Sequence, residues 1–191
     1  MTDSTSAAPA AAQPAAAPVY HYAPIARRGA AFVLDWAIVT AVLFAVVYGV
    51  GVAFVLHRAD HTKAIDAYTD VASFLVQPLW VLMIWLYCAV LEGGPHEETL
   101  GQLAFGMKVI DYAGRPIGYF RASVRILLKI LFCLPLLITD DLGGISNFPL
   151  GATLLLASLP FVFDCAFALV TPRKQALHDL IVRCLVVKKH P

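Results

Sequence analysis

Four ionisable residues lie inside long apolar segments of this 191-residue chain: Asp35, Arg125, Lys129 and Asp164. Placing an ionised side chain at the centre of a membrane helix costs about 2.5–3.5 kcal/mol, so such residues normally face one another or a polar cavity. A carboxylate left unpaired there is able to bind and release a proton or a sodium ion, whereas a strongly paired carboxylate is a poor proton carrier. The four residues predict a buried polar cluster.

The depth of these charges along their segments is similar. Asp35, Lys129 and Asp164 each stand seven or eight residues from the polar end of their segment. At the rise of a helix this is about 10–12 Å, so the three side chains are expected at one level of the membrane. We predict an ion pair between Lys129 and Asp164 with Asp35 nearby, and we expect Arg125 to reach back to the interface. Such a cluster either binds a proton or an ion, or it only holds helices in register.

The apolar segments indicate the class of fold. Hydrophobic residues make up 60% of the chain and charged residues 14%, whereas soluble domains are nearer to about 50% and 25%. Long apolar runs predict an all-α integral membrane protein with four transmembrane helices, at about 29–56, 71–91, 122–139 and 148–171. Because the 122–139 run carries Arg125 and Lys129, a re-entrant or interfacial helix is the alternative there.

Basic residues are distributed unevenly over the two sides of this arrangement. Twelve of the fourteen Arg and Lys residues fall on the side of the chain ends, and Arg58 and Lys63 fall on the other. Since cytoplasmic loops carry the excess of Arg and Lys, both termini are predicted to be cytoplasmic, in a bacterial-type inner membrane. The Ala/Pro-rich residues 1–24 are expected to form a disordered tail, and residues 25–191 the transmembrane domain.

The polar segments outside the runs carry shorter structural signals. Residues 100–107 have the spacing of an amphipathic surface helix. Two short apolar pieces, at 108–111 and 184–187, are expected to pair as strands on the cytoplasmic face. Asp179 is expected to cap a short helix and to tie the tail to the 99–115 loop. Arg28 is expected to anchor the first helix at the membrane interface, where it binds lipid phosphate or caps a loop, and is not expected to bind a substrate.

Three separated motifs resemble the RDD family of membrane proteins. The first is "RRGAAFVLDWAIV", with an arginine and an aspartate seven residues apart; the second is "TLGQLAFGMKVIDYAGRPI"; the third is "ALHDLIVRCLVV". The matching positions are Arg28, Asp35, Thr99, Leu100, Gly101, Gly106, Val109, Asp111, Gly114, His178 and Asp179. The chain departs from the family pattern at Gln102, where lysine is frequent. The resemblance implies a multi-pass membrane protein, with transport of unknown ligands suggested for the family and sodium/proton antiport for some members.

Two functions therefore remain open from the sequence. One is a small transporter or cation/proton exchanger built on the buried Asp/Lys cluster, functioning as a homo-oligomer because four helices leave little room for a pathway. The other is a non-transporting assembly or partner-binding protein in which the buried charges are structural. No nucleophile, phosphate loop or metal-ligand pattern is found, so we expect no enzyme, no cofactor, no metal and no nucleic-acid partner.

Overall fold

The computed structural model describes residues 20–137 and 150–189. They form six helices and two strands in this order: α1 (Ile25–Leu56), α2 (His61–Gly93), α3 (Leu100–Ala104), β1 (Met107–Asp111), α4 (Gly118–Leu137), α5 (Leu150–Val170), α6 (Leu177–Val182) and β2 (Cys184–Lys188). The fold is mostly helical, as the apolar runs predict.

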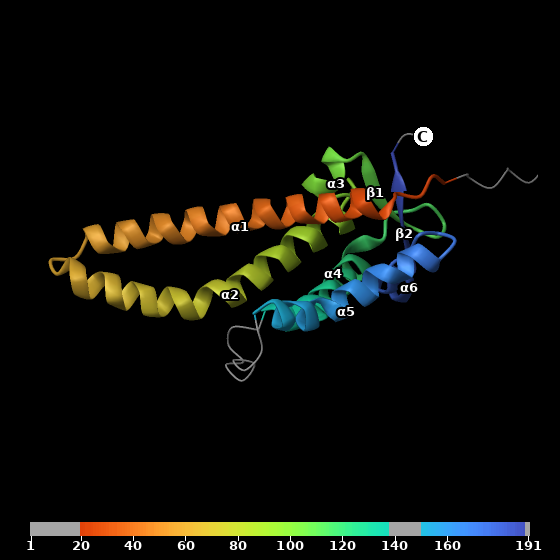
Figure 1. Ribbon diagram of the computed structural model, residues 1–191. Helices are drawn as coiled ribbons and strands as arrows, with labels where there is room; N and C mark the ends of the chain where they lie inside the picture. Colours follow the sequence, from red (N-terminus) through yellow and green to blue (C-terminus); the bar gives the residue numbers. More distant parts are fainter. Residues whose placement is uncertain (1–19, 138–149, 190–191) are drawn as a thin grey trace, which may run out of the picture.

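Helices α1 and α2 form a long antiparallel hairpin that extends well beyond the other elements (Figure 1). They have 32 and 33 residues, or about 48–50 Å at the helical rise, which exceeds the roughly 30 Å of a hydrocarbon core. In the most apolar window of each helix only 17% of the residues are buried. A core helix of a soluble protein would be mostly buried, so these are two candidate membrane-spanning helices.

The first helical turns of α2 correct one prediction. Residues 61–70 were expected in a polar loop, but α2 begins at His61. Asp60 caps the helix, because its side chain accepts a hydrogen bond from the Lys63 backbone N–H at 3.2 Å. A capped polar turn lengthens the hairpin beyond the predicted 71–91 span.

Helices α4 and α5 lie where the predicted spans 122–139 and 148–171 fall, although residues 138–149 are outside the described part of the chain. Helix α4 carries Arg121, Arg125 and Lys129, and it does not have the length and hydropathy of the two candidate spans. The four-span arrangement therefore stays a prediction. Helix α2 packs against α1 and α4, and α4 packs against α5.

A small sheet gathers the remaining elements at one end of the helices. Strands β1 and β2 are antiparallel, with Val109 opposite Val186, and they join the segments that were expected to pair. Figure 1 shows α3, α6 and both described ends of the chain at this same end. Whether this end faces the cytoplasm stays a prediction.

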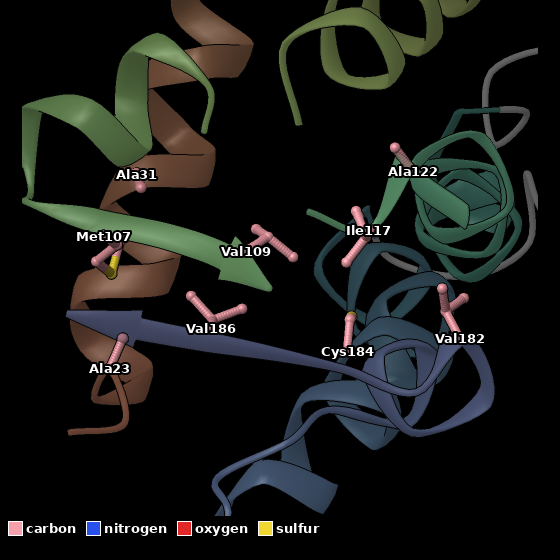
Figure 2. Close-up of a cluster of buried hydrophobic side chains, with 9 residues drawn as sticks. All are labelled: Ala23, Ala31, Met107, Val109, Ile117, Ala122, Val182, Cys184 and Val186. Atoms are coloured by element: carbon pink, nitrogen blue, oxygen red, sulfur yellow. The ribbon is translucent and has the colours of Figure 1, made fainter. Parts of the chain in front are cut away.

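One face of the sheet packs on the helices. Figure 2 shows this cluster, whose members come from α1, both strands, α4 and α6 and the segments beside them: Ala23, Ala31, Met107, Val109, Ile117, Ala122, Val182, Cys184 and Val186. Met107 is fully buried in β1, so it does not belong to the amphipathic helix expected over residues 100–107. That helix, α3, ends at Ala104. The cluster fixes the sheet against the ends of three helices.

The other face of the sheet is covered by the segment before α1. Tyr20 and Tyr22 pack on Ile110, Leu185 and Val187. The backbone of this segment also pairs with β2, because Ala23 N–H donates to the Val186 carbonyl at 3.0 Å. The folded domain thus begins before residue 25, where the sequence placed the end of the tail; residues 1–19 lie outside the described part.

Candidate functional site

Asp35 is the first centre of a buried polar network. It lies in the first third of α1 and is 5% exposed. Its carboxylate accepts hydrogen bonds from the Tyr87 hydroxyl at 2.6 Å, the Thr99 hydroxyl at 2.6 Å and the Gly101 backbone N–H at 2.7 Å. Thr99 is the N-cap of α3 and forms a capping box with Gln102. Asp35 therefore completes the N-terminus of a surface helix, a position that favours a negative charge.

The contact between α1 and α3 requires a glycine at position 101, because a side chain there would not fit. A Cβ at this position would clash with the carbonyl oxygen of Ala31 and stand 2.8 Å from both Cγ and Oδ1 of Asp35. The backbones of α1 and α3 meet here without an intervening side chain, which lets the Gly101 N–H reach the carboxylate. This explains the glycine of the Thr-Leu-Gly motif.

Glu92 and Arg125 form the second centre. Nη1 of Arg125 lies 2.5 Å from both carboxylate oxygens of Glu92. Glu92 also accepts a hydrogen bond from the Gln102 amide at 2.7 Å, and Lys129 Nζ is 3.9 Å from its Oε1. Glu92 is 1% exposed and Arg125 3%, so α2, α3 and α4 are joined by a fully desolvated pair. Breaking such a pair by removing one partner is strongly destabilising.

Asp179 of α6 forms the third centre and is fully buried. It accepts hydrogen bonds from Nε of Arg125 at 2.8 Å and from Nη1 of Arg28 at 2.9 Å. Burial alone would raise the pKa of this carboxyl, but the neighbouring charges of His178, Arg125 and Arg28 hold it well below its usual value. Asp179 is thus an ionised bridge between α1, α4 and α6.

His178 joins Asp179 to Asp164 of α5. Its Nδ1 lies 2.7 Å from Oδ2 of Asp164, and its Nε2 lies 3.1 Å from Oδ1 of Asp179. The backbone N–H of His178 also donates to Asp164 at 2.9 Å. A neutral imidazole has one N–H donor, whereas both ring nitrogens here face carboxylate oxygens. The two contacts are satisfied together when the ring carries two protons, so the geometry fits an imidazolium.

The structure brings the predicted residues together with different partners. Lys129 contacts Glu92 and Asp164 contacts His178, so the predicted Lys129–Asp164 ion pair is replaced by these two contacts. The reason is that Glu92 of α2 faces α4, while α6 folds back beneath α5. Arg125 is buried by two carboxylates and does not reach back to the interface.

The tail motif also differs from the prediction. Asp179 was expected to cap a short helix, but it lies inside α6, whose N-cap is Ala176. It was also expected to bond to the 99–115 loop, but it binds arginines of α1 and α4 instead. Gly106 lies outside the network, at a positive φ of 62° in the turn from α3 to β1, where glycine is favoured. Whether the network residues bind an ion stays a prediction.

Glu92, Tyr87 and Gln102 belong to the network but were missed as site residues. Glu92 was read as the start of a loop because it follows the last apolar residue of the second run. The signal that could have found it was the demand for a partner from Arg125, since a buried arginine needs a carboxylate.

The network borders a cavity of about 280 Å³. Its polar lining comes from Arg28, Asp35, Glu92, Gln102, Arg125, Lys129, His178 and Asp179, and the rest of the lining is apolar. Within residues 20–137 and 150–189, no cluster of three or more His, Cys, Asp or Glu side chains is arranged to hold a metal ion.

Two exposed apolar helices that are long and apolar enough to cross a membrane meet a buried ionic network, which is consistent with a helical membrane protein. A sequence model of the RDD family matches residues 22–183. The chain belongs to the RDD family, and the resemblance carried by its three motifs is confirmed. The chain matches no curated protein and no solved structure.

Proposed function

We propose that this RDD family member exchanges a monovalent cation for a proton across the membrane, with His178 as the proton-binding group. The observation that carries the proposal is the placement of both ring nitrogens of His178 within hydrogen-bonding distance of carboxylates, from Asp164 and Asp179. A histidine ring can bind a proton on either nitrogen and release it again.

The charges of the network support a one-for-one exchange. The network contains four carboxylates, from Asp35, Glu92, Asp164 and Asp179, and three basic side chains, from Arg28, Arg125 and Lys129. With a protonated His178 the network is neutral, and without that proton it has one excess negative charge. A buried excess charge is costly, so a cation such as Na⁺ entering the cavity would balance the loss of the proton. Both loaded states are then neutral, which is the electrostatic condition for alternating access.

The proposed topology is the four-span one, with α4 and α5 completing the bundle and both termini in the cytoplasm of a bacterial-type cell. Since a four-helix chain leaves little room for a pathway, a homo-oligomer is part of the proposal. We propose no enzymatic activity.

The test uses the purified full-length chain in sealed vesicles with an imposed pH gradient and a pH-sensitive dye. Addition of Na⁺ or Li⁺ should dissipate the gradient, and His178→Gln should slow this at least tenfold, because glutamine has no titrating proton. The matched control is His61→Gln, since His61 is exposed at the far end of the hairpin. It should behave as the wild-type chain does.

The outcomes separate this proposal from its rival. A gradient that persists after Na⁺ and Li⁺ with the wild-type protein would overturn exchange. Equal rates for the wild type and a folded His178→Gln variant would leave exchange standing and remove His178 from it. Asp35→Asn then tests the other buried aspartate of the same cavity.

A second candidate is a non-transporting assembly or partner-binding protein, and one observation favours it. Within the described chain, both oxygens of each of the four carboxylates already have a donor or an ion-pair partner, and Asp35 has three donors. Saturated charges hold helices together without titrating. The working surface would then be the small sheet end, where Tyr119 and Phe120 are 59% and 81% exposed. Vesicles that keep their gradient would support this function.

A further inference from the structure

Arg28 has hydrogen-bonding capacity that the described residues do not use. Its Nη1 donates to Asp179, but Nε and Nη2 are buried and have no partner within the described chain. A guanidinium has five N–H donors, and its unpaired donors are costly once they are removed from water. Arg28 is one of the residues that line the 280 Å³ cavity. The two unpaired nitrogens point to a missing acceptor.

Lys129, which also lines this cavity, has a similar surplus. Its ammonium group lies 3.9 Å from Glu92, which is beyond hydrogen-bonding distance, and Glu92 is already held on both oxygens by Arg125. The side chains of Lys129 and Arg28 are each 14% exposed. Because the neighbouring carboxylates are occupied, the groups with free capacity in this cavity are two cations.

A second, apolar cavity lies next to the first one. It has a volume of about 330 Å³, and it shares Phe32, Lys129 and Phe161 with the first cavity. Its other lining residues are hydrophobic: Trp36, Trp80, Ile84, Ile126, Ile130 and Cys133. Trp36 is 45% exposed, so this cavity reaches the outer surface of α1. The rings of Phe32 and Phe161, which line both cavities, are stacked with their centroids 5.9 Å apart.

We propose that this groove between α1, α4 and α5 binds an anionic phospholipid. The phosphate accepts from Arg28 Nε and Nη2 and from Lys129, and one acyl chain lies past Phe32 and Phe161 along Trp36 and Ile130. Pockets for small ligands have this form, mostly apolar with a few convergent polar groups. An arginine fork and a lysine are the usual partners of a phosphate. The proposal goes beyond cation exchange and does not depend on it.

A lipid fits the groove better than other occupants because the free charges and the apolar cavity are adjacent. A monovalent cation has no acceptor atoms, so it cannot satisfy the free donors of Arg28 and Lys129. Inorganic phosphate would satisfy the donors but leave the second cavity unfilled. A phospholipid with net charge, such as phosphatidylglycerol, satisfies both, whereas phosphatidylcholine brings a quaternary ammonium close to two cations.

The experiment measures lipid retention on the purified full-length chain in neutral detergent by native mass spectrometry. Phosphatidylglycerol, phosphatidylcholine and inorganic phosphate are added in separate titrations. Lys129→Gln removes one cation and should weaken phosphatidylglycerol binding about fivefold, the usual effect of one basic residue near an anionic lipid. Arg28→Lys keeps a charge beside Asp179 but removes Nε and Nη2 with their N–H donors, and it should weaken binding as well.

A variant of the apolar part distinguishes a lipid from a simple anion. Cys133→Phe should fill the second cavity without touching the ionic network, and it should reduce phosphatidylglycerol retention while leaving any phosphate binding unchanged. The matched control is Lys63→Gln, because the Lys63 side chain is 87% exposed at the distant turn. It should bind as the wild type does.

Several results would overturn the proposal. They are equal retention of phosphatidylglycerol and phosphatidylcholine, retention unaffected by Lys129→Gln and Cys133→Phe, or displacement of the lipid by an equal concentration of inorganic phosphate. The proposal would also be overturned if the lipid were lost when the protein is concentrated, because that result would mean that a second copy of the chain fills the groove. None of these readouts depends on a pH gradient, so failure here is distinct from failure of exchange.

Discussion

Substitution of Gly101 by alanine tests the close contact between α1 and α3. Alanine is intrinsically the better helix residue by about 1 kcal/mol, so a helix-propensity argument alone predicts stabilisation. The structure predicts the opposite, because the new Cβ would clash with the Ala31 carbonyl oxygen and stand 2.8 Å from the Asp35 carboxyl carbon. Backbone of α1 cannot swing aside as a flexible side chain would, so α3 must move away.

The size of the effect follows from two losses. Overpacking a tight contact costs about 1–3 kcal/mol. Moving α3 also weakens the 2.7 Å hydrogen bond from Gly101 N–H to the Asp35 carboxylate, and hydrogen bonds to charged groups contribute about 1.5–3 kcal/mol. After allowance for helix propensity, a net destabilisation of about 2–4 kcal/mol is expected. For a chain of this size that lowers the melting temperature by about 4–16 °C.

The assay is thermal unfolding of the detergent-purified protein, followed by intrinsic fluorescence. Gly29→Ala is the matched control, because Gly29 is also helical and a Cβ there would meet nothing within 4 Å. That variant should melt at the wild-type temperature or slightly above it. If Gly101→Ala had the same melting temperature as Gly29→Ala, the tight junction between α1 and α3 would be refuted.

Three further predictions concern the charges and the sheet end. Arg125→Leu should destabilise the fold by about 3–5 kcal/mol in the same melt, since it leaves the buried charge of Glu92 without its main partner, and a second change, Glu92→Gln, should recover part of the loss. Burial would raise the pKa of Asp111, but the N–H groups of Arg115 and Ala113 hold it below its usual 3.8; its stabilisation is therefore complete above about pH 4 and lost as pH falls through the lowered value. At pH 7, Asp111→Asn should therefore be less stable than the wild type by about 1 kcal/mol and should melt at a lower temperature. In acid the melting temperatures of the two proteins should become equal. Burial also raises the pKa of the Cys184 thiol, so maleimide should label Cys184 only after unfolding in SDS, and fast labelling of the native protein would contradict its burial.

The helices and the strand pairing could be predicted because their signals are local. Apolar runs gave α1 and α2, and short β-type pieces gave β1 and β2. The start of α2 at His61 could not be predicted from hydropathy, because the turn that extends it is polar and held by the Asp60 cap.

The sequence could predict several residues of the polar site, but it could not predict which of them contact one another. Charge inside an apolar run is costly, and this predicts a buried polar cluster made of Asp35, Arg125, Lys129 and Asp164. Their partners depend on how α3 and α6 fold back onto the longer helices, and depth along a helix contains no information on rotation about its axis. Glu92 takes the place predicted for Asp164 beside Lys129 for that reason.

The bond between Arg28 and Asp179 joins residues 151 positions apart, and this has a consequence for biogenesis. The first hairpin leaves the ribosome and enters the bilayer long before α6 is made. During that interval Arg28 and Arg125 have no Asp179 to neutralise them, and Asp164 has no His178. A chain ending before Leu177 would therefore lack the Asp179 partner of Arg28 and the His178 partner of Asp164, so the ionic network is complete only once α6 has folded onto the longer helices.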